Sequence, residues 1–316
     1  MLTAYKTLES KLQEVSWDPL HKGIWIKLVN PTSEEILKIS ATVQIPEHFF
    51  RFAVDEDDSP RIILGKKCIL AIISVPVSHG ADRYETSPLS IILTPEVTIT
   101  ISEDLIQVLP DSKDGSRFLF DTTKRTQLFF QILYHADTIF LKFIRHIRQR
   151  TDEIEFCLRK STNNREVFQL LDLEKGLTYF TAALRGNVIV AETILRMRSD
   201  PQMLYLLEMH EEDEDVLESV IIENKRALQL TQTYSDIMSS MMDAFSSVIN
   251  NNLNQILKFL ASVTILLAIP TMISSFWSVS LKVPWQGTET GFWIVLMLAL
   301  ITSSAVGIIL RKKGML

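Results

Sequence analysis

Two long apolar stretches without a charged side chain lie near the C-terminus, at residues 259–277 and 291–310. Each stretch is long enough to cross about 30 Å of hydrocarbon as an α-helix. Buried core helices of soluble proteins are usually shorter and carry polar residues along one face. The sequence therefore predicts a membrane protein with two transmembrane helices, 259–277 and 291–310, joined by an outer loop at 278–290.

Basic residues are more numerous on one side of the two predicted spans than on the other. Lys258 precedes the first span and a basic tail, 311–316, follows the second, whereas the loop 278–290 carries one Lys and one Glu. Positively charged flanks tend to stay in the cytoplasm. We therefore expect a multi-pass protein of the plasma membrane, with both termini and most of its mass in the cytoplasm.

The chain before the spans divides where its hydrophobic period changes. Residues 1–117 contain short strand-like runs, and a helix opened by a hydroxyl cap within 31–35 (PTSEE) with acidic residues in its first turn. From residue 118 the period is helical, and the last helix, from about residue 212, contains no Gly or Pro before Pro270. We expect an α+β cytoplasmic domain at 1–117 and a long helical stalk at 118–258. Strands are expected at 23–30, 61–64, 68–75, 89–94 and 98–102.

The predicted stalk runs directly into the first span, and its length bears on assembly. A helix from about residue 212 to residue 277 is too long for a compact monomer, so it requires packing against neighbouring helices or copies of itself. The sequence therefore predicts a homo-oligomer arranged around an axis in the lipid bilayer.

One stripe of mostly small or hydroxylic residues follows the first span in alternating steps of three and four. It consists of Asn254, Leu257, Ala261, Thr264, Ala268, Thr271, Ser275 and Ser278. In a membrane such a stripe either packs helices closely or lines a wet path, and both interpretations remain open. Asn254 favours a pore, because an amide is costly in lipid unless it is hydrated or paired.

Charge and motif content argue against several other classes of protein. A net charge of −6 does not favour nucleic-acid binding, which normally requires a basic surface. The phosphate-binding glycine motifs and the common hydrolase motifs are not found in the sequence. We therefore expect no enzymatic activity, no cofactor, and neither a nucleic-acid nor a nucleotide partner.

Five segments resemble the CorA family of magnesium transporters, in family order and over nearly the whole chain. They are 25–35 (WIKLVNPTSEE), 170–180 (LLDLEKGLTYF), 220–230 (VIIENKRALQL), 243–254 (DAFSSVINNNLN) and 268–271 (AIPT). The resemblance implies a CorA-like homopentameric channel whose stalk helix continues as the pore-lining span. The transported ion would be a divalent cation moving down its electrochemical gradient, Mg²⁺ first, with Co²⁺, Ni²⁺ or Zn²⁺ as alternatives.

The resemblance also implies roles for individual stripe residues. Asn254 would form the cytoplasmic polar ring of the pore, and Leu257 an apolar constriction. Thr271 and Ser275 would line its outer half.

The outer mouth departs from the family pattern. The family places Tyr-Gly-Met-Asn just after the first span, where this chain has Trp277, Ser278, Val279 and Ser280. The family's Asn carbonyls hold hydrated Mg²⁺ through its water shell, whereas the serines offer hydroxyl oxygens of shorter reach. Two alternatives follow: a channel of altered ion selectivity, or a non-transporting regulatory homologue.

Two acidic runs, 55–58 and 211–215, are candidates for binding a regulatory divalent cation. The family binds regulatory Mg²⁺ through acidic residues between neighbouring cytoplasmic domains. This resemblance suggests the following metal ligands: Asp55, Asp57, Asp58, Asp213 and Asp215. The other interpretation, a solvated loop and an acidic helix start, is favoured for either run taken singly.

Overall fold

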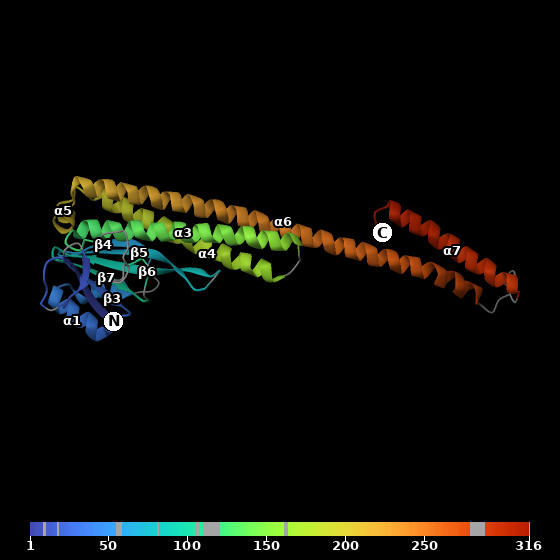
Figure 1. Cartoon of the computed structure of the whole chain (residues 1–316), viewed down its shortest axis with the longest axis horizontal. Helices are drawn as coiled ribbons and strands as arrows, with labels where there is room; N and C mark the ends of the chain where they lie inside the picture. Colours follow the sequence, from blue (N-terminus) through green and yellow to red (C-terminus); the bar gives the residue numbers. More distant parts are fainter. Residues whose placement is uncertain are drawn as a thin grey trace. The chain divides into compact units, whose positions relative to one another are not determined.

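The computed structural model describes residues 1–8, 11–17, 19–54, 59–80, 82–104, 106, 108–109, 121–160, 164–278 and 288–315. The chain divides into two compact units, Met1–Ser240 and Met241–Leu316. The first unit contains the sheet and most of the helices, and the second contains the C-terminal helices (Figure 1).

A seven-stranded mixed sheet forms the centre of the first unit. Its strands are β1 (Leu2–Leu8), β2 (Lys11–Glu14), β3 (Ile24–Val29), β4 (Arg61–Leu64), β5 (Ile69–Ser78), β6 (Tyr84–Leu93) and β7 (Val97–Ser102). The strand order is β2-β1-β3-β7-β6-β5-β4, in which β3 and β7 are parallel and the other neighbours antiparallel. The five predicted strands correspond to β3–β7, whereas β1 and β2 were not predicted.

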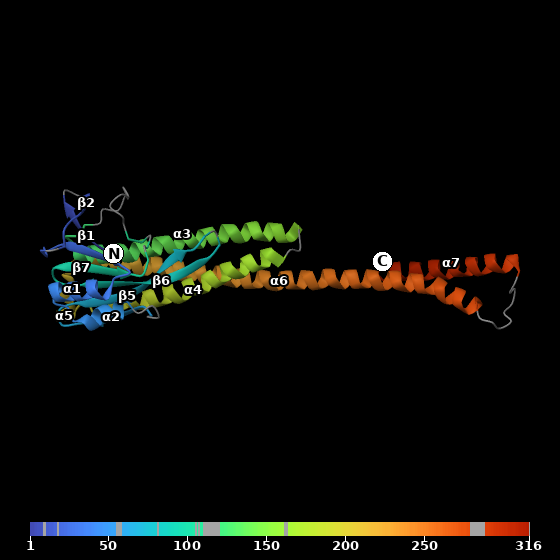
Figure 2. The ribbon, with the colours of Figure 1, turned by 90° about the horizontal axis from the view of Figure 1, so that it is seen from below.

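Different helices cover the two faces of the sheet (Figures 1 and 2). On one face, α1 (Ser33–Val43) and α2 (Glu47–Val54) contribute Ile39 and Phe50 to a core shared with the strands. On the other face lie α3 (Arg125–Lys160) and α4 (Asn164–Arg196). The predicted hydroxyl cap is present, since the Glu35 N–H donates to Thr32 Oγ1 at 3.3 Å. The α+β class is confirmed.

A buried amide on α4 completes the hydrogen bonding of β5 where β4 has ended. The pairing of β4 with β5 reaches Ile72, two residues before Ser74. The Ser74 N–H donates to Asn187 Oδ1 at 2.9 Å, and Asn187 Nδ2 donates to the Ser74 carbonyl at 2.8 Å. The preceding Gly186 permits this approach, because a Cβ there would lie 2.6 Å from Pro60 Cγ. The α4 helix therefore substitutes for the missing length of β4.

We expect Asn187→Ala to lower the free energy of unfolding by about 1–3 kcal/mol, because both half-buried backbone groups of Ser74 would lose their partner. Thermal unfolding of the full-length protein in detergent measures the loss. Asn251→Ala is the matched control, because the Asn251 side chain is exposed on a helix surface. An equal loss in both variants would contradict this role for Asn187.

The remaining helices lead to the C-terminus. They are α5 (Pro201–Leu207), α6 (Glu211–Trp277) and α7 (Glu289–Lys312). The 67-residue α6 begins in the first unit and ends in the second. The helix α7 begins at a hydroxyl cap, where the Gly291 N–H donates to Thr288 Oγ1 at 3.2 Å.

Candidate functional site

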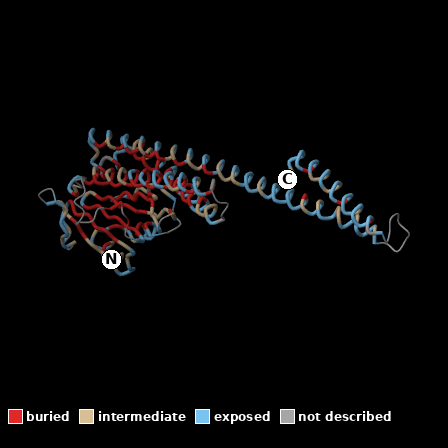
Figure 3. Tube along the Cα trace, turned by 45° about the vertical axis from the view of Figure 1, so that its right-hand side comes forward, coloured by how far each residue is buried: buried red, intermediate tan, exposed pale blue. Residues whose placement is uncertain are grey.

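The apolar parts of α6 and α7 are exposed in the single chain. Only 6% of the most hydrophobic 18-residue stretch of α6 is buried, and 11% of that of α7. A core helix of a soluble protein would be mostly buried, so these two helices are candidate membrane spans. Figure 3 shows the contrast between these exposed helices and the buried sheet of the first unit.

Within the second unit, α6 uses one face to contact α7 and the residues after it. Ser262 is fully buried there, and its hydroxyl lies 2.8 Å from the Lys258 carbonyl and 3.0 Å from the Met315 carbonyl. One turn further along α6, Leu266 packs against Gly307 of α7: a Cβ added to Gly307 would lie 3.5 Å from Leu266 Cδ2. This face of α6 is therefore occupied by contacts within the same chain.

The predicted stripe lies on the open side of α6. All eight of its residues are exposed: Asn254, Leu257, Ala261, Thr264, Ala268, Thr271, Ser275 and Ser278. At 100° per residue, the stripe is centred on the side of the helix roughly opposite Ser262 and Leu266. A groove on this open side is lined by Thr264, Leu267, Ala268, Thr271, Met272, Ser275 and Phe276. The stripe is thus available to contact neighbouring subunits or a water-filled path.

The stripe hydroxyls are oriented by the helix backbone. Thr264 Oγ1 donates to the Leu260 carbonyl and Thr271 Oγ1 to the Leu267 carbonyl, each at 2.9 Å. Because each hydroxyl proton is used within the helix, the oxygen retains its lone pairs as hydrogen-bond acceptors. The water molecules around a hydrated cation donate hydrogen bonds, so these oxygens suit such an ion.

The outer-mouth residues are described only in part. Ser278 is exposed, and its hydroxyl donates to the Ser275 carbonyl at 3.0 Å. Val279 and Ser280 lie outside the described residues. Their role as a filter therefore stays a prediction.

The two acidic runs differ in what the structure describes. Asp55, Asp57 and Asp58 lie outside the described residues. At the start of α6, Asp213 Oδ2 accepts the His210 N–H at 3.0 Å, while Asp215 is exposed. Among the described residues of one chain, no group of three or more His, Cys, Asp or Glu side chains is placed to hold a metal ion. Asp213 has a capping role, and metal binding stays a prediction.

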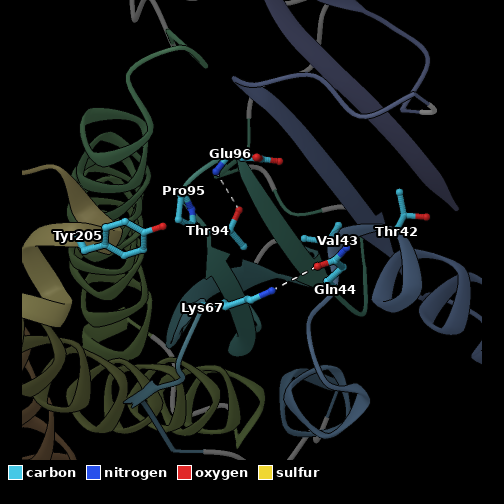
Figure 4. A pocket seen from close by; sticks show the side chains of 8 residues that line it. All are labelled: Thr42, Val43, Gln44, Lys67, Thr94, Pro95, Glu96 and Tyr205. Carbon is cyan, nitrogen blue, oxygen red and sulfur yellow. Dashed lines mark hydrogen bonds between the residues drawn. The ribbon is translucent and has the colours of Figure 1, made fainter.

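A polar pocket of about 310 Å³ lies at one end of the sheet (Figure 4). It is lined by Thr42, Val43, Gln44, Lys67, Thr94, Pro95, Glu96 and Tyr205. Its polar groups are engaged with each other: Lys67 Nζ donates to Gln44 Oε1 at 3.3 Å, and the Glu96 N–H to Thr94 Oγ1 at 3.3 Å. These contacts stabilise turns, and they occupy polar groups that could otherwise bind a ligand.

A second pocket, lined by basic side chains of α3, was missed by the sequence analysis. Lys142, Arg145 and Arg150 of α3 line it together with the end of the β5–β6 hairpin. The three-residue spacing of Lys142 and Arg145, which makes them neighbours on a helix surface, was a usable signal in the sequence. The hairpin that closes the pocket was not visible from that spacing.

Comparisons with known proteins agree with this architecture. The sequence profile of the family described as CorA-like Mg2+ transporter protein matches residues 21–312. The Cobalt/magnesium transport protein CorA of Methanocaldococcus jannaschii is 27% identical over 317 residues, covering 97% of this chain and 95% of the relative.

Solved structures show the same fold. The complete structure of the CorA magnesium transporter from M. jannaschii matches with a TM-score of 0.81 at 22% identity, covering 100% of this chain and 99% of that one. The full-length CmaX protein matches with a TM-score of 0.71 at 14% identity, covering 98% and 97%. Because the family profile spans most of the chain, the protein belongs to the CorA-like Mg2+ transporter family, whose members transport ions and are not enzymes.

Proposed function

We propose that the protein is a homopentameric channel of the plasma membrane that passes a divalent cation down its electrochemical gradient. Mg²⁺ is the first candidate ion, with Co²⁺, Ni²⁺ and Zn²⁺ as alternatives. The observation that carries the proposal is the exposed stripe on α6, on the side of the helix away from its contacts with α7. The similarity to a cobalt/magnesium transport protein supports the same class of substrate.

In this arrangement five copies of α6 surround the ion path and the α7 helices lie outside them. Exposed apolar side chains on α7, such as Phe292 (65% exposed) and Ile301 (63%), would then contact lipid. The basic residues Lys258, Arg311 and Lys312 favour a cytoplasmic position for the inner ends of both spans and for both termini.

The pore chemistry suits an ion that keeps its water. Mg²⁺ sheds its hydration shell reluctantly, so acceptor oxygens that bind through that shell match it. Asn254 would form a polar ring at the cytoplasmic end, Leu257 would narrow the path, and Thr271 and Ser275 would supply oxygens further out. A membrane potential of 100 mV, negative inside, would drive a divalent ion inward with about 4.6 kcal/mol.

Regulation by the transported ion forms a second part of the proposal. Asp213 and Asp215 lie in the first turns of α6, and Asp55, Asp57 and Asp58 form the other acidic run. Carboxylates from adjacent subunits would together bind Mg²⁺ and favour a closed channel.

The test is Mg²⁺ uptake into proteoliposomes that contain the purified oligomer, read with an internal Mg²⁺ dye at a negative potential. Saturable uptake is the expected result. Repeating the assay with Co²⁺, Ni²⁺ and Zn²⁺ ranks the ions. No uptake of any of the four, from protein shown to be an intact oligomer, would exclude the proposal.

A second candidate function rests on Ser278, Val279 and Ser280, which replace the family's Gly-Met-Asn. The chain would then be a channel for other ions or a regulatory homologue that does not transport. Reversal potentials in mixed salts identify the altered channel. For the regulatory homologue, the combined variant Ser278→Gly with Ser280→Asn would gain a large Mg²⁺ flux that the parent protein lacks.

A further inference from the structure

We propose that the basic pocket between α3 and the β5–β6 hairpin binds a soluble, phosphate-bearing polyanion. The pocket has a volume of about 780 Å³, which exceeds the space needed for a single phosphate group. It is lined by Ser78, Gly80, Tyr84, Lys142, Phe143, Arg145, His146, Gln149 and Arg150. All of these residues belong to the first unit, whereas the stripe residues of α6 belong to the second.

The polar side chains of the pocket come from one face of α3. Lys142, Arg145, His146 and Gln149 are separated by three or four residues, so they are neighbours along the helix surface. Each of the four is exposed. Their nitrogen atoms can therefore converge on one anion.

Within the described residues, no carboxylate neutralises two of the three cations in the pocket. Arg150 is neutralised, because Asp82 binds its guanidinium with contacts of 2.7 and 2.9 Å and Glu153 contacts it as well. The Arg150 hydrogen bond holds the pKa of Asp82 below its usual value, so this carboxylate stays charged and engaged. In the part of the chain that the structure describes, Lys142 and Arg145 have no acidic partner within ion-pair distance.

The walls of the pocket are fixed by packing. The ring of Tyr84 is 97% buried, with ring centroids 5.4 Å from Phe143 and 6.0 Å from Phe180, and its hydroxyl is hydrogen-bonded to His146 Nδ1. On the hairpin, a Cβ on Gly80 would meet no atom within 4 Å. A ligand therefore meets a preformed site with a rigid floor and an open edge.

The donor set favours an anion such as phosphate over a metal cation. Ammonium and guanidinium groups form charge-assisted hydrogen bonds with phosphate oxygens, and among the described residues no Asp or Glu lines the pocket to bind a metal cation. The whole chain carries a net charge of −6, so a general attraction to polyanions does not explain binding at this place. The recognition would be local to Lys142 and Arg145.

Calorimetric titration of the full-length protein in detergent with sodium pyrophosphate, in buffer free of Mg²⁺, tests the site. We expect saturable binding that weakens as NaCl is raised, because the contacts are ionic. The double variant Lys142→Gln with Arg145→Gln should weaken binding at least tenfold. Arg148→Gln, which removes an exposed cation of the same helix outside the pocket, should leave it unchanged.

Three results would overturn the proposal: no saturable binding to the parent protein, no weakening in the double variant, or equal weakening in the Arg148→Gln control. The single variants Lys142→Gln and Arg145→Gln keep the test valid if the double variant does not fold, since each should weaken binding in part. Vesicles that carry phosphorylated lipid headgroups form a further arm. Binding to these vesicles without binding to pyrophosphate would contradict a soluble ligand.

Discussion

Asn254→Leu is expected to reduce Mg²⁺ uptake at least tenfold, whereas Leu257→Ala is expected to raise the leak of ions through the resting protein. Both side chains are exposed on α6 and lie on the predicted stripe. In the proposed pentamer, leucines in place of five amides would remove hydrogen-bond acceptors for the ion's water shell. A loss of about 1.4 kcal/mol in the stabilisation of the hydrated ion at this ring corresponds to a tenfold effect. The smaller side chain at residue 257 would widen an apolar constriction. Proteoliposome flux measures both changes.

Two matched variants separate a pore from a packing surface. Asn252→Leu makes the same change two residues earlier, about 160° around α6 from Asn254, and Leu300→Ala shortens an exposed leucine of α7. Neither should alter flux by more than about twofold, since neither lies on the stripe. If Asn254→Leu and Leu257→Ala gave equal flux, the stripe would be a helix-packing surface.

The parts of the fold that the sequence predicted are those specified by local patterns. The helix α6 ends at Trp277, which is also the last residue of the uncharged run. The start of α1 is set by the cap that Thr32 and Glu35 form. The strands β1 and β2 were missed, because their charged and polar residues resemble those of a surface segment. The parallel pairing of β3 with β7 joins Ile24 to Val97, a distance in sequence that no local pattern can bridge.

Of the two candidate functional surfaces, the stripe on α6 could be predicted from the sequence, whereas the basic pocket could not. The stripe lies on one helix, so a periodicity of 3.5 residues was enough to identify it as a candidate. In the basic pocket, Lys142 and Arg145 meet Gly80 and Tyr84 from a hairpin about sixty residues away in sequence. A close contact of that kind depends on tertiary packing, here of α3 against β5 and β6.

A buried acid joins α3 to α6 in the first unit. Asp137 and Asn224 are each 2% exposed, and Asn224 Nδ2 donates to Asp137 Oδ1 at 2.7 Å. Within the described residues, Asp137 Oδ2 and Asn224 Oδ1 have no hydrogen-bond partner. A proton on Asp137 Oδ2 would provide the donor that this pair lacks, since an acid and an amide can exchange two hydrogen bonds. The pair is therefore best satisfied with Asp137 neutral.

The resulting pH dependence has a definite sign. Burial raises the pKa of Asp137 well above its usual value, while the Asn224 hydrogen bond lowers it and the nearby Glu223 raises it. The folded protein therefore holds this proton at pH values where the unfolded chain, with a pKa of about 3.9, has lost it. The contribution of Asp137 to stability is therefore greatest at low pH and falls, by up to about 1.4 kcal/mol per pH unit, as the pH rises towards the folded pKa.

Asp137→Asn is expected to stabilise the protein at pH 8 relative to the parent, with the difference shrinking as the pH approaches 4. The introduced amide can exchange the same two hydrogen bonds with Asn224 at every pH, so the proton is no longer needed. Asp137→Ala should instead lose about 1–3 kcal/mol relative to Asp137→Asn, because it leaves the buried Asn224 amide without a partner.

Thermal unfolding of the full-length protein between pH 4 and pH 8, for the parent and each variant, measures these differences. Asp152→Asn provides the control, because Asp152 is an exposed carboxylate on the same helix. A parent and an Asp137→Asn variant whose stabilities change in parallel with pH would show that Asp137 is ionised in the folded protein. The expected result, a difference that grows with pH, would mean that a proton helps to hold α6 against α3. The contact between α6 and α3 in the first unit would then respond to pH.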